Sequence, residues 1–187
     1  MQTEQAVKLL EGGLEDASLQ LNLLVLLGTL AEASSDTCQL VLDAGGLEQL
    51  LARADPQRGE QMQEAAVDGL CKLAANSTAA KDAAAAAGAI PRLAALLGDG
   101  GSGEVRVRAL LCLGMLLGGS SERQLELAAA PGALACLLAL MRQQDDADCQ
   151  QIAGGLFKEL AANAEAKEAL TRALKEAQQA QGSAKFV

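Results

Sequence analysis

The sequence has no histidine, no tryptophan and no tyrosine, and Phe157 and Phe186 are its only aromatic residues. Histidine is the most common general base, and Ser–His and Cys–His nucleophiles depend on it. Its absence argues against an enzyme, so we predict that the chain has no catalytic residues. With so few aromatic side chains, a hydrophobic core has to be built from leucine, alanine, valine and isoleucine.

Clusters of positive charge are scarce as well. The chain has 15 Lys and Arg against 24 Asp and Glu, which gives a formal net charge of −9. Such a surface repels nucleic-acid phosphates and anionic lipids, and we predict that it binds no nucleic acid. Arg106 and Arg108 form a short basic pair. We interpret this pair as a solvated helix face, with contact to an acidic partner as the alternative.

Patterns that bind metals or phosphates are also missing. The five cysteines have no Cys-x-x-Cys spacing, and no histidine completes a zinc site. The carboxylate pairs Glu64/Asp68 and Asp145/Asp146 match no calcium loop, so we interpret them as solvated helix ends. The glycine-rich segment 98–103 lacks the Lys-Ser/Thr of a phosphate-binding loop. We therefore predict no metal and no cofactor.

An odd number of cysteines without paired spacing is typical of small buried side chains in a reducing compartment. The longest apolar stretch without charge, residues 127–141, is interrupted by Pro131 and Gly132 and is too short to span a bilayer. We expect no membrane insertion and a soluble cytoplasmic protein.

A period of about 43 residues is the strongest pattern that is present. Two unrelated landmarks share it, at intervals of 43 or 44 residues: a glycine stop at Gly45, Gly88 and Gly132, and a leucine that closes an apolar run at Leu30, Leu73, Leu116 and Leu160. A fixed period of this length indicates a stacked array of helices. Alanine and leucine favour helix, and β-branched residues are sparse, so the predicted class is all-α.

Each period divides into three predicted helices. We predict one domain over residues 1–187, with full repeats at 34–76, 77–119 and 120–163, a half repeat at 4–33 and a capping helix at 164–181. The predicted helices are 4–11, 14–33, 34–44, 47–54, 61–75, 77–87, 90–97, 104–117, 120–130, 133–142 and 145–162. We expect Gly88 to be a left-handed helix stop and the tail from Gly182 to fray. Cys71 and Cys112 are expected to be buried on third helices.

The string Ala87-Gly-Ala-Ile-Pro-Arg-Leu-Ala-Ala-Leu-Leu97, together with a long helix ending Gly69-Leu-Cys-Lys-Leu-Ala-Ala-Asn76, resembles the armadillo repeat. The resemblance extends over residues 4–163, with the HEAT repeat as the close rival. It implies a right-handed α-solenoid in which the third helices line a concave groove. Armadillo arrays have many unrelated partners, so the resemblance indicates the fold more than the function.

The resemblance also implies which side chains face the groove. The groove positions lie one, five and nine residues before each closing leucine. Those that we single out are Glu64, Asp68, Lys72, Leu111, Met115 and Glu159. Nuclear import adaptors place asparagine and tryptophan in the first two of these positions, and neither occurs here, which argues against recognition of nuclear-localisation peptides. Glu64, Asp68 and Glu159 remain able to attract a basic segment.

The predicted function is a non-enzymatic scaffold that binds a peptide or helix of another protein in this groove, within a larger assembly. The expected partner segment carries basic and apolar side chains. The alternative is a co-chaperone that exchanges nucleotide on the seventy-kilodalton heat-shock chaperone, because Glu104-Val-Arg-Val-Arg-Ala-Leu110 is similar to a third-helix opening of small armadillo proteins of that kind.

Overall fold

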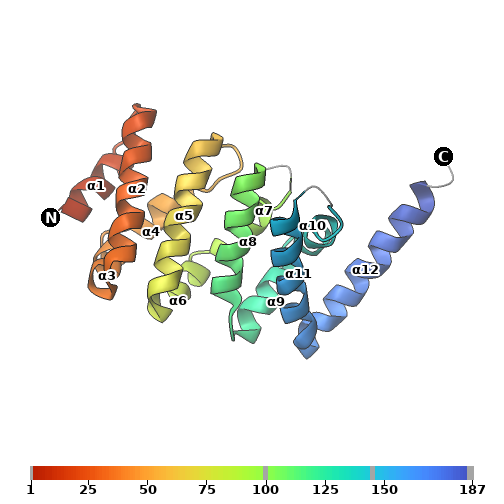
Figure 1. Cartoon of the computed structure of the whole chain (residues 1–187). Coiled ribbons are helices and arrows are strands. Elements are labelled where there is room, and N and C mark those ends of the chain that lie inside the picture. Colours follow the sequence, from red (N-terminus) through yellow and green to blue (C-terminus); the bar gives the residue numbers. More distant parts are fainter. Residues whose placement is uncertain (1, 99–100, 144–145, 185–187) are drawn as a thin grey trace.

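The computed structural model describes residues 2–98, 101–143 and 146–184, and beyond residue 175 only the course of the backbone. Within these ranges it contains helices and no strand, which confirms the all-α class (Figure 1). The helices are α1 Gln2–Glu11, α2 Ala17–Ala33, α3 Ser35–Asp43, α4 Gly46–Arg53, α5 Glu60–Asn76, α6 Thr78–Ala86, α7 Ala89–Ala95, α8 Gly103–Leu117, α9 Ser121–Ala129, α10 Ala133–Leu140, α11 Ala147–Ala162 and α12 Ala164–Ala184.

The long helices α2, α5, α8 and α11 stand side by side in one row, and each packs on the next (Figure 1). The shorter helices lie behind this row, and α12 follows α11 at the end of the array. The core lies between the two layers of helices. It consists mainly of buried leucine and alanine side chains on the inward-facing sides of nearly all these helices. We call the open side of the row, formed by α2, α5, α8 and α11, the third-helix face.

Helix starts repeat with the same period as the leucines. Ser34, Ser77 and Ser120 cap α3, α6 and α9, and each hydroxyl accepts a hydrogen bond from the backbone N–H three residues on. Asn163 continues the series at α12, where its side chain accepts bonds from the N–H groups of residues 165 and 166. This regular capping fixes where every first helix begins.

Caps also explain where the predicted bounds were wrong. The α2 helix begins at Ala17 rather than residue 14, because Asp16 accepts hydrogen bonds from the backbone of Ser18 and Leu19. Asp146 caps α11, and the bond from Cys149 N–H lowers the pKa of its carboxyl group. The predicted start at Asp145 and the loop at 99–100 lie outside the described residues. The last helix continues to Ala184 rather than ending at residue 181.

The three periodic glycines have positive φ angles, 84° at Gly45, 76° at Gly88 and 74° at Gly132. Each precedes a second helix, and only glycine adopts this left-handed region without strain. The prediction of left-handed stops at these positions is confirmed.

Replacing Gly88 by valine should lower the free energy of unfolding by about 1–2 kcal/mol, because a β-branched residue resists the left-handed region. An added Cβ meets nothing within 4 Å, so the cost is one of backbone conformation alone. Urea unfolding followed by circular dichroism measures it. Gly154→Val is the matched control, since that helical position is equally open. Equal effects of the two substitutions would contradict the strain argument.

A side-chain clamp recurs near the start of each long helix. In each case a side-chain amide or guanidinium donates a hydrogen bond to a backbone carbonyl of the preceding loop or helix end. Gln63 donates to the carbonyls of Asp55, Pro56 and Arg58. The equivalent bonds run from Gln20 to Leu14, from Arg106 to Gly98 and from Gln150 to Met141. Gln63 is 3% exposed and is one of the few buried polar side chains. Arg106 is therefore part of the scaffold and not simply a solvated residue.

All five cysteines are thiols in the described part of the chain. Cys38, Cys112 and Cys149 are buried, as expected for Cys112, but the prediction for Cys71 was wrong because it is only half-buried. Cys71 lies on the flank of α5 next to α8, where its thiol donates to the carbonyl of Arg108 at 3.5 Å. Burial, with the nearby Asp146, raises the pKa of Cys149 to about 12.

No single described helix is long and apolar enough to cross a bilayer. The α9 and α10 helices reach that length and apolar character only when taken together, and a 90° bend separates them.

Candidate functional site: the third-helix face

The third-helix face carries the twelve groove positions in three rows, and none of their side chains is buried. The middle row contains the two most exposed apolar members, Val25 on α2 at 52% and Leu111 on α8 at 43%. Removing leucine and valine side chains from water is energetically favourable, so these two positions suit contact with another molecule. Sequence reasoning singled out Leu111 but not Val25.

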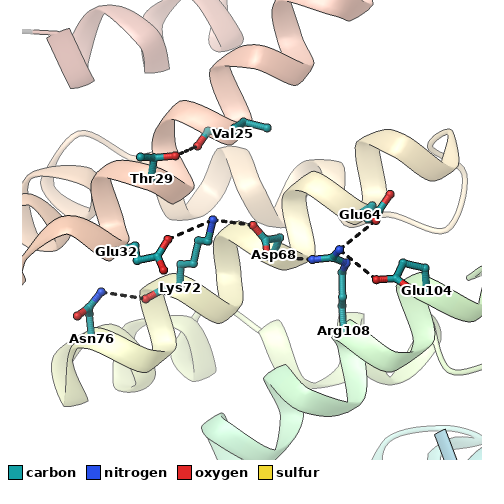
Figure 2. Close-up of polar contacts among 9 residues, drawn as sticks. All are labelled: Val25, Thr29, Glu32, Glu64, Asp68, Lys72, Asn76, Glu104 and Arg108. Carbon is teal, nitrogen blue, oxygen red and sulfur yellow. Dashed lines mark hydrogen bonds and ion pairs between the residues drawn. The ribbon is translucent and has the colours of Figure 1, made fainter. Parts of the chain in front are cut away.

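Ion pairs connect α2, α5 and α8 across this face (Figure 2). Lys72 Nζ lies 3.3 Å from Glu32 Oε2 and 3.0 Å from Asp68 Oδ2. Arg108 bridges to the other side of Asp68 at 3.0 Å, and also to Glu64 at 3.1 Å and Glu104 at 3.0 Å. We call this chain of six side chains, Glu32, Glu64, Asp68, Lys72, Glu104 and Arg108, the charge ladder.

The ion pairs of the charge ladder change the role expected for the predicted acidic residues. Glu64 and Asp68 were expected to be solvated helix ends free to attract a basic segment, but both are paired with Arg108, and Asp68 also with Lys72. The hydrogen bond from Lys72 to Asp68 raises the pKa of the lysine. A basic partner therefore has to compete with two cations that already occupy these carboxylates.

Arg108 is a central residue of the charge ladder that sequence reasoning missed. Its side chain is 31% exposed and reaches carboxylates on two helices, while its Nε is buried and has no hydrogen-bond partner in the described structure. The interpretation of Arg108 as a solvated helix face was wrong, because the side chain lies across α5. The signal available in the sequence is that Arg108 lies on the next long helix, between the repeat positions that correspond to Glu64 and Asp68.

A shallow depression of about 320 Å³ lies beside the charge ladder. Apolar groups of α2 and α5 form one part of its wall and charged groups the other; the lining residues are Leu21, Val25, Gln61, Glu64, Ala65, Asp68 and Arg108. A site that combines an apolar surface with a few fixed polar groups is suited to binding rather than to chemistry. Within the described ranges, no three cysteine or carboxylate side chains are placed to hold a metal ion.

The remaining predicted residues do not all join this site. Met115 is half-buried and packs against the core. Glu159 lies on α11 and accepts a hydrogen bond at 3.0 Å from Gln124 of α9, which in turn accepts one from Asn163. The structure thus brings Glu64, Asp68 and Lys72 together, places Leu111 and Met115 on the adjacent helix, and ties Glu159 to a first helix.

Solved structures of designed helical repeat proteins resemble the chain. One is a computationally designed armadillo repeat protein for modular peptide recognition, with a TM-score of 0.80 and 26% identity over 91% of this chain and 69% of its own. A second designed armadillo repeat protein matches with a TM-score of 0.77 and 27% identity, over 91% and 69% of the two chains.

The fold therefore defines a helical repeat protein, and the chain has an armadillo-like repeat fold. No protein-family model matches the sequence, and neither does any curated protein. The likeness supports a repeat scaffold for protein binding.

Proposed function

We propose that the protein binds an extended segment or a helix of another protein on its third-helix face. The observation that carries this proposal is the depression between α2 and α5, which lies next to the exposed Val25 and to the charge ladder. Val25 and Leu111 occupy the same repeat position on α2 and α8, so an elongated ligand that crosses α5 would meet both. The similar designed armadillo repeat protein was made for modular peptide recognition, which supports a peptide-binding function.

The charges of the site favour a partner segment with some basic side chains. The charge ladder holds four carboxylates and two cations, so it keeps a surplus of negative charge. Because these groups are partly exposed, their attraction is screened by salt and contributes less than apolar contact. We infer that apolar contacts at Val25 and Leu111 supply most of the affinity, and that the charge ladder sets orientation.

A peptide selection tests this proposal. Peptides of about 16 residues displayed on phage would be selected against the immobilised protein, and the strongest binder synthesised and titrated by calorimetry. We expect selected peptides to carry apolar residues together with lysine or arginine. Val25→Ala and Leu111→Ala should each weaken binding about fivefold or more, with little dependence on salt, as for central contacts of an interface.

Leu40→Ala is the matched control, because Leu40 is 56% exposed but lies on the first helix α3. Its removal should leave peptide affinity unchanged. If Leu40→Ala abolished binding while the folded Val25 and Leu111 variants bound normally, the third-helix face would not be the binding site.

Nucleotide exchange on a seventy-kilodalton chaperone stays a prediction that rests on residues 104–110. Two of these residues, Glu104 and Arg108, belong to the charge ladder. Release of labelled ADP from the purified chaperone, measured with and without this protein, distinguishes it: acceleration would favour the exchange factor over a passive scaffold.

A further inference from the structure

The outer flank of α2 lies at the N-terminal end of the row of long helices (Figure 1). It exposes two leucines whose counterparts in the later repeats are buried or half-buried. Leu19 is 39% exposed and Leu26 is 41% exposed. They lie seven residues apart, so both project from the same side of the helix. Leu9 of α1 is another exposed leucine of this first half repeat, at 43%.

Along the row, neighbouring long helices contact each other at the same pair of repeat positions. An added Cβ at Gly28 of α2 would lie 3.2 Å from Gly69 Cα of α5, and one at Gly114 of α8 would lie 3.7 Å from Leu156 Cδ2 of α11. Between them, Cys71 of α5 stands in the position of Gly28, and Cys112 of α8 in that of Gly69. In each pair, a small residue on one long helix thus contacts a residue on the side of the next long helix that faces back towards the N-terminal end of the row.

Leu26 is the backward-facing member of this series on α2, one repeat before Gly69. Gly69 is buried, Cys112 is 0% exposed and Leu156 is 3% exposed. The series that begins with Leu19 is similar: Met62 is half-buried and packs against the core, and Val105 and Cys149 are both at 0%. The flank of α2 therefore has the chemistry of an interface between repeats, and no helix of the described chain covers it.

We propose that this flank is a dimer interface, on which two copies of the chain pack α2 against α2 in antiparallel orientation about a twofold axis near Leu26. In this arrangement Leu26 meets its own counterpart, and Leu19 meets the position of Ala33 in the second copy. The interface continues the row of long helices across the axis, so it extends the packing already present within each copy.

Charge and shape favour this pairing over a head-to-tail arrangement. The α2 helix has no charged residue between Ala17 and Ala31, so burying it removes no charge from water, although the chain carries a net charge of −9. At the other end of the array the forward-facing position is Lys158, and α12 adds exposed charges at Lys167, Glu168 and Arg172. A charged end cannot cover the leucines of α2 without burying those charges, whereas a second α2 can.

The size of the flank sets the expected strength. A helix of 17 residues is about 25 Å long, which places a single helix pair at the lower end of specific interfaces. We therefore expect a reversible dimer that forms at micromolar concentration. This proposal does not depend on the third-helix face, because the two surfaces lie on different sides of α2.

Sedimentation velocity of the full chain from about 1 to 200 µM tests it in the concentration range of such interfaces. The wild type should shift from the monomer mass of 19.1 kDa to twice that value. Leu26→Glu should raise the dissociation constant at least about 100-fold, because it forces a carboxylate into the apolar contact. Leu26→Met keeps the apolar volume and should stay within about fivefold of the wild type.

Leu111→Glu is the control for an exposed leucine at a different place. It should leave the dimer intact, and circular dichroism should show that all variants are folded; Leu19→Glu replaces Leu26→Glu if the latter unfolds. A wild type that stays monomeric up to the highest concentration overturns the proposal. So does a dimer that resists both Leu26→Glu and Leu19→Glu, or one that Leu111→Glu alone disrupts.

Discussion

Replacing Gly69 by valine should lower the free energy of unfolding by about 3 kcal/mol, the upper part of the range for overpacked cores. An added Cβ would lie 2.6 Å from Cδ2 of Leu50, a side chain that is fully buried and has no free space to move into. Valine adds two further methyl groups where α5 also packs against α2, since an added Cβ at Gly28 would lie 3.2 Å from Gly69 Cα. Chemical denaturation followed by circular dichroism measures the loss.

Gly155→Val is the matched control for this substitution. Gly155 is exposed on α11, and an added Cβ meets nothing within 4 Å. Valine has a slightly higher helix propensity than glycine, so this variant should change stability by less than about 0.5 kcal/mol. If Gly69→Val were equally harmless, α5 would not pack against Leu50 of α4 as closely as the structure has it.

The second large effect is expected at Gln63, where leucine should cost about 2 kcal/mol. The Gln63 amide nitrogen lies 3.2 Å from the Asp55 carbonyl oxygen, 3.1 Å from that of Pro56 and 2.8 Å from that of Arg58. Leucine fills the same space but donates no hydrogen bond, so the loop between α4 and α5 loses its anchor. Thermal and urea unfolding would both report the change.

Gln150→Leu is the matched control, because it makes the same substitution at an exposed copy of the clamp. Gln150 holds the corresponding position but is exposed and makes a single bond of 3.0 Å to the carbonyl of Met141. Water replaces that bond readily, so the expected loss is below about 1 kcal/mol. A larger loss at Gln150 than at Gln63 would mean that burial does not control the strength of the clamp.

The candidate site was only partly predictable. The resemblance to armadillo repeats indicated which positions face outwards, and those positions include Asp68, Lys72 and Leu111. It did not indicate that Arg108 pairs with the carboxylates of α5, because a long flexible side chain chooses its partner only when two helices lie side by side. Glu64 and Asp68, predicted to be free to attract a basic segment, are therefore paired within the charge ladder.

The sequence by itself determined the period, the helical class and the helix stops. Gly88 and Ser77 act through their own backbone neighbours, and Leu73 and Leu116 report burial through their spacing, so each signal is local and can be read along the chain. Only the tertiary structure decided which surfaces remain open. Leu26 and Leu156 hold the same repeat position and are both leucines, yet one is 41% exposed and the other 3%. The difference is the neighbouring helix, which no local pattern contains.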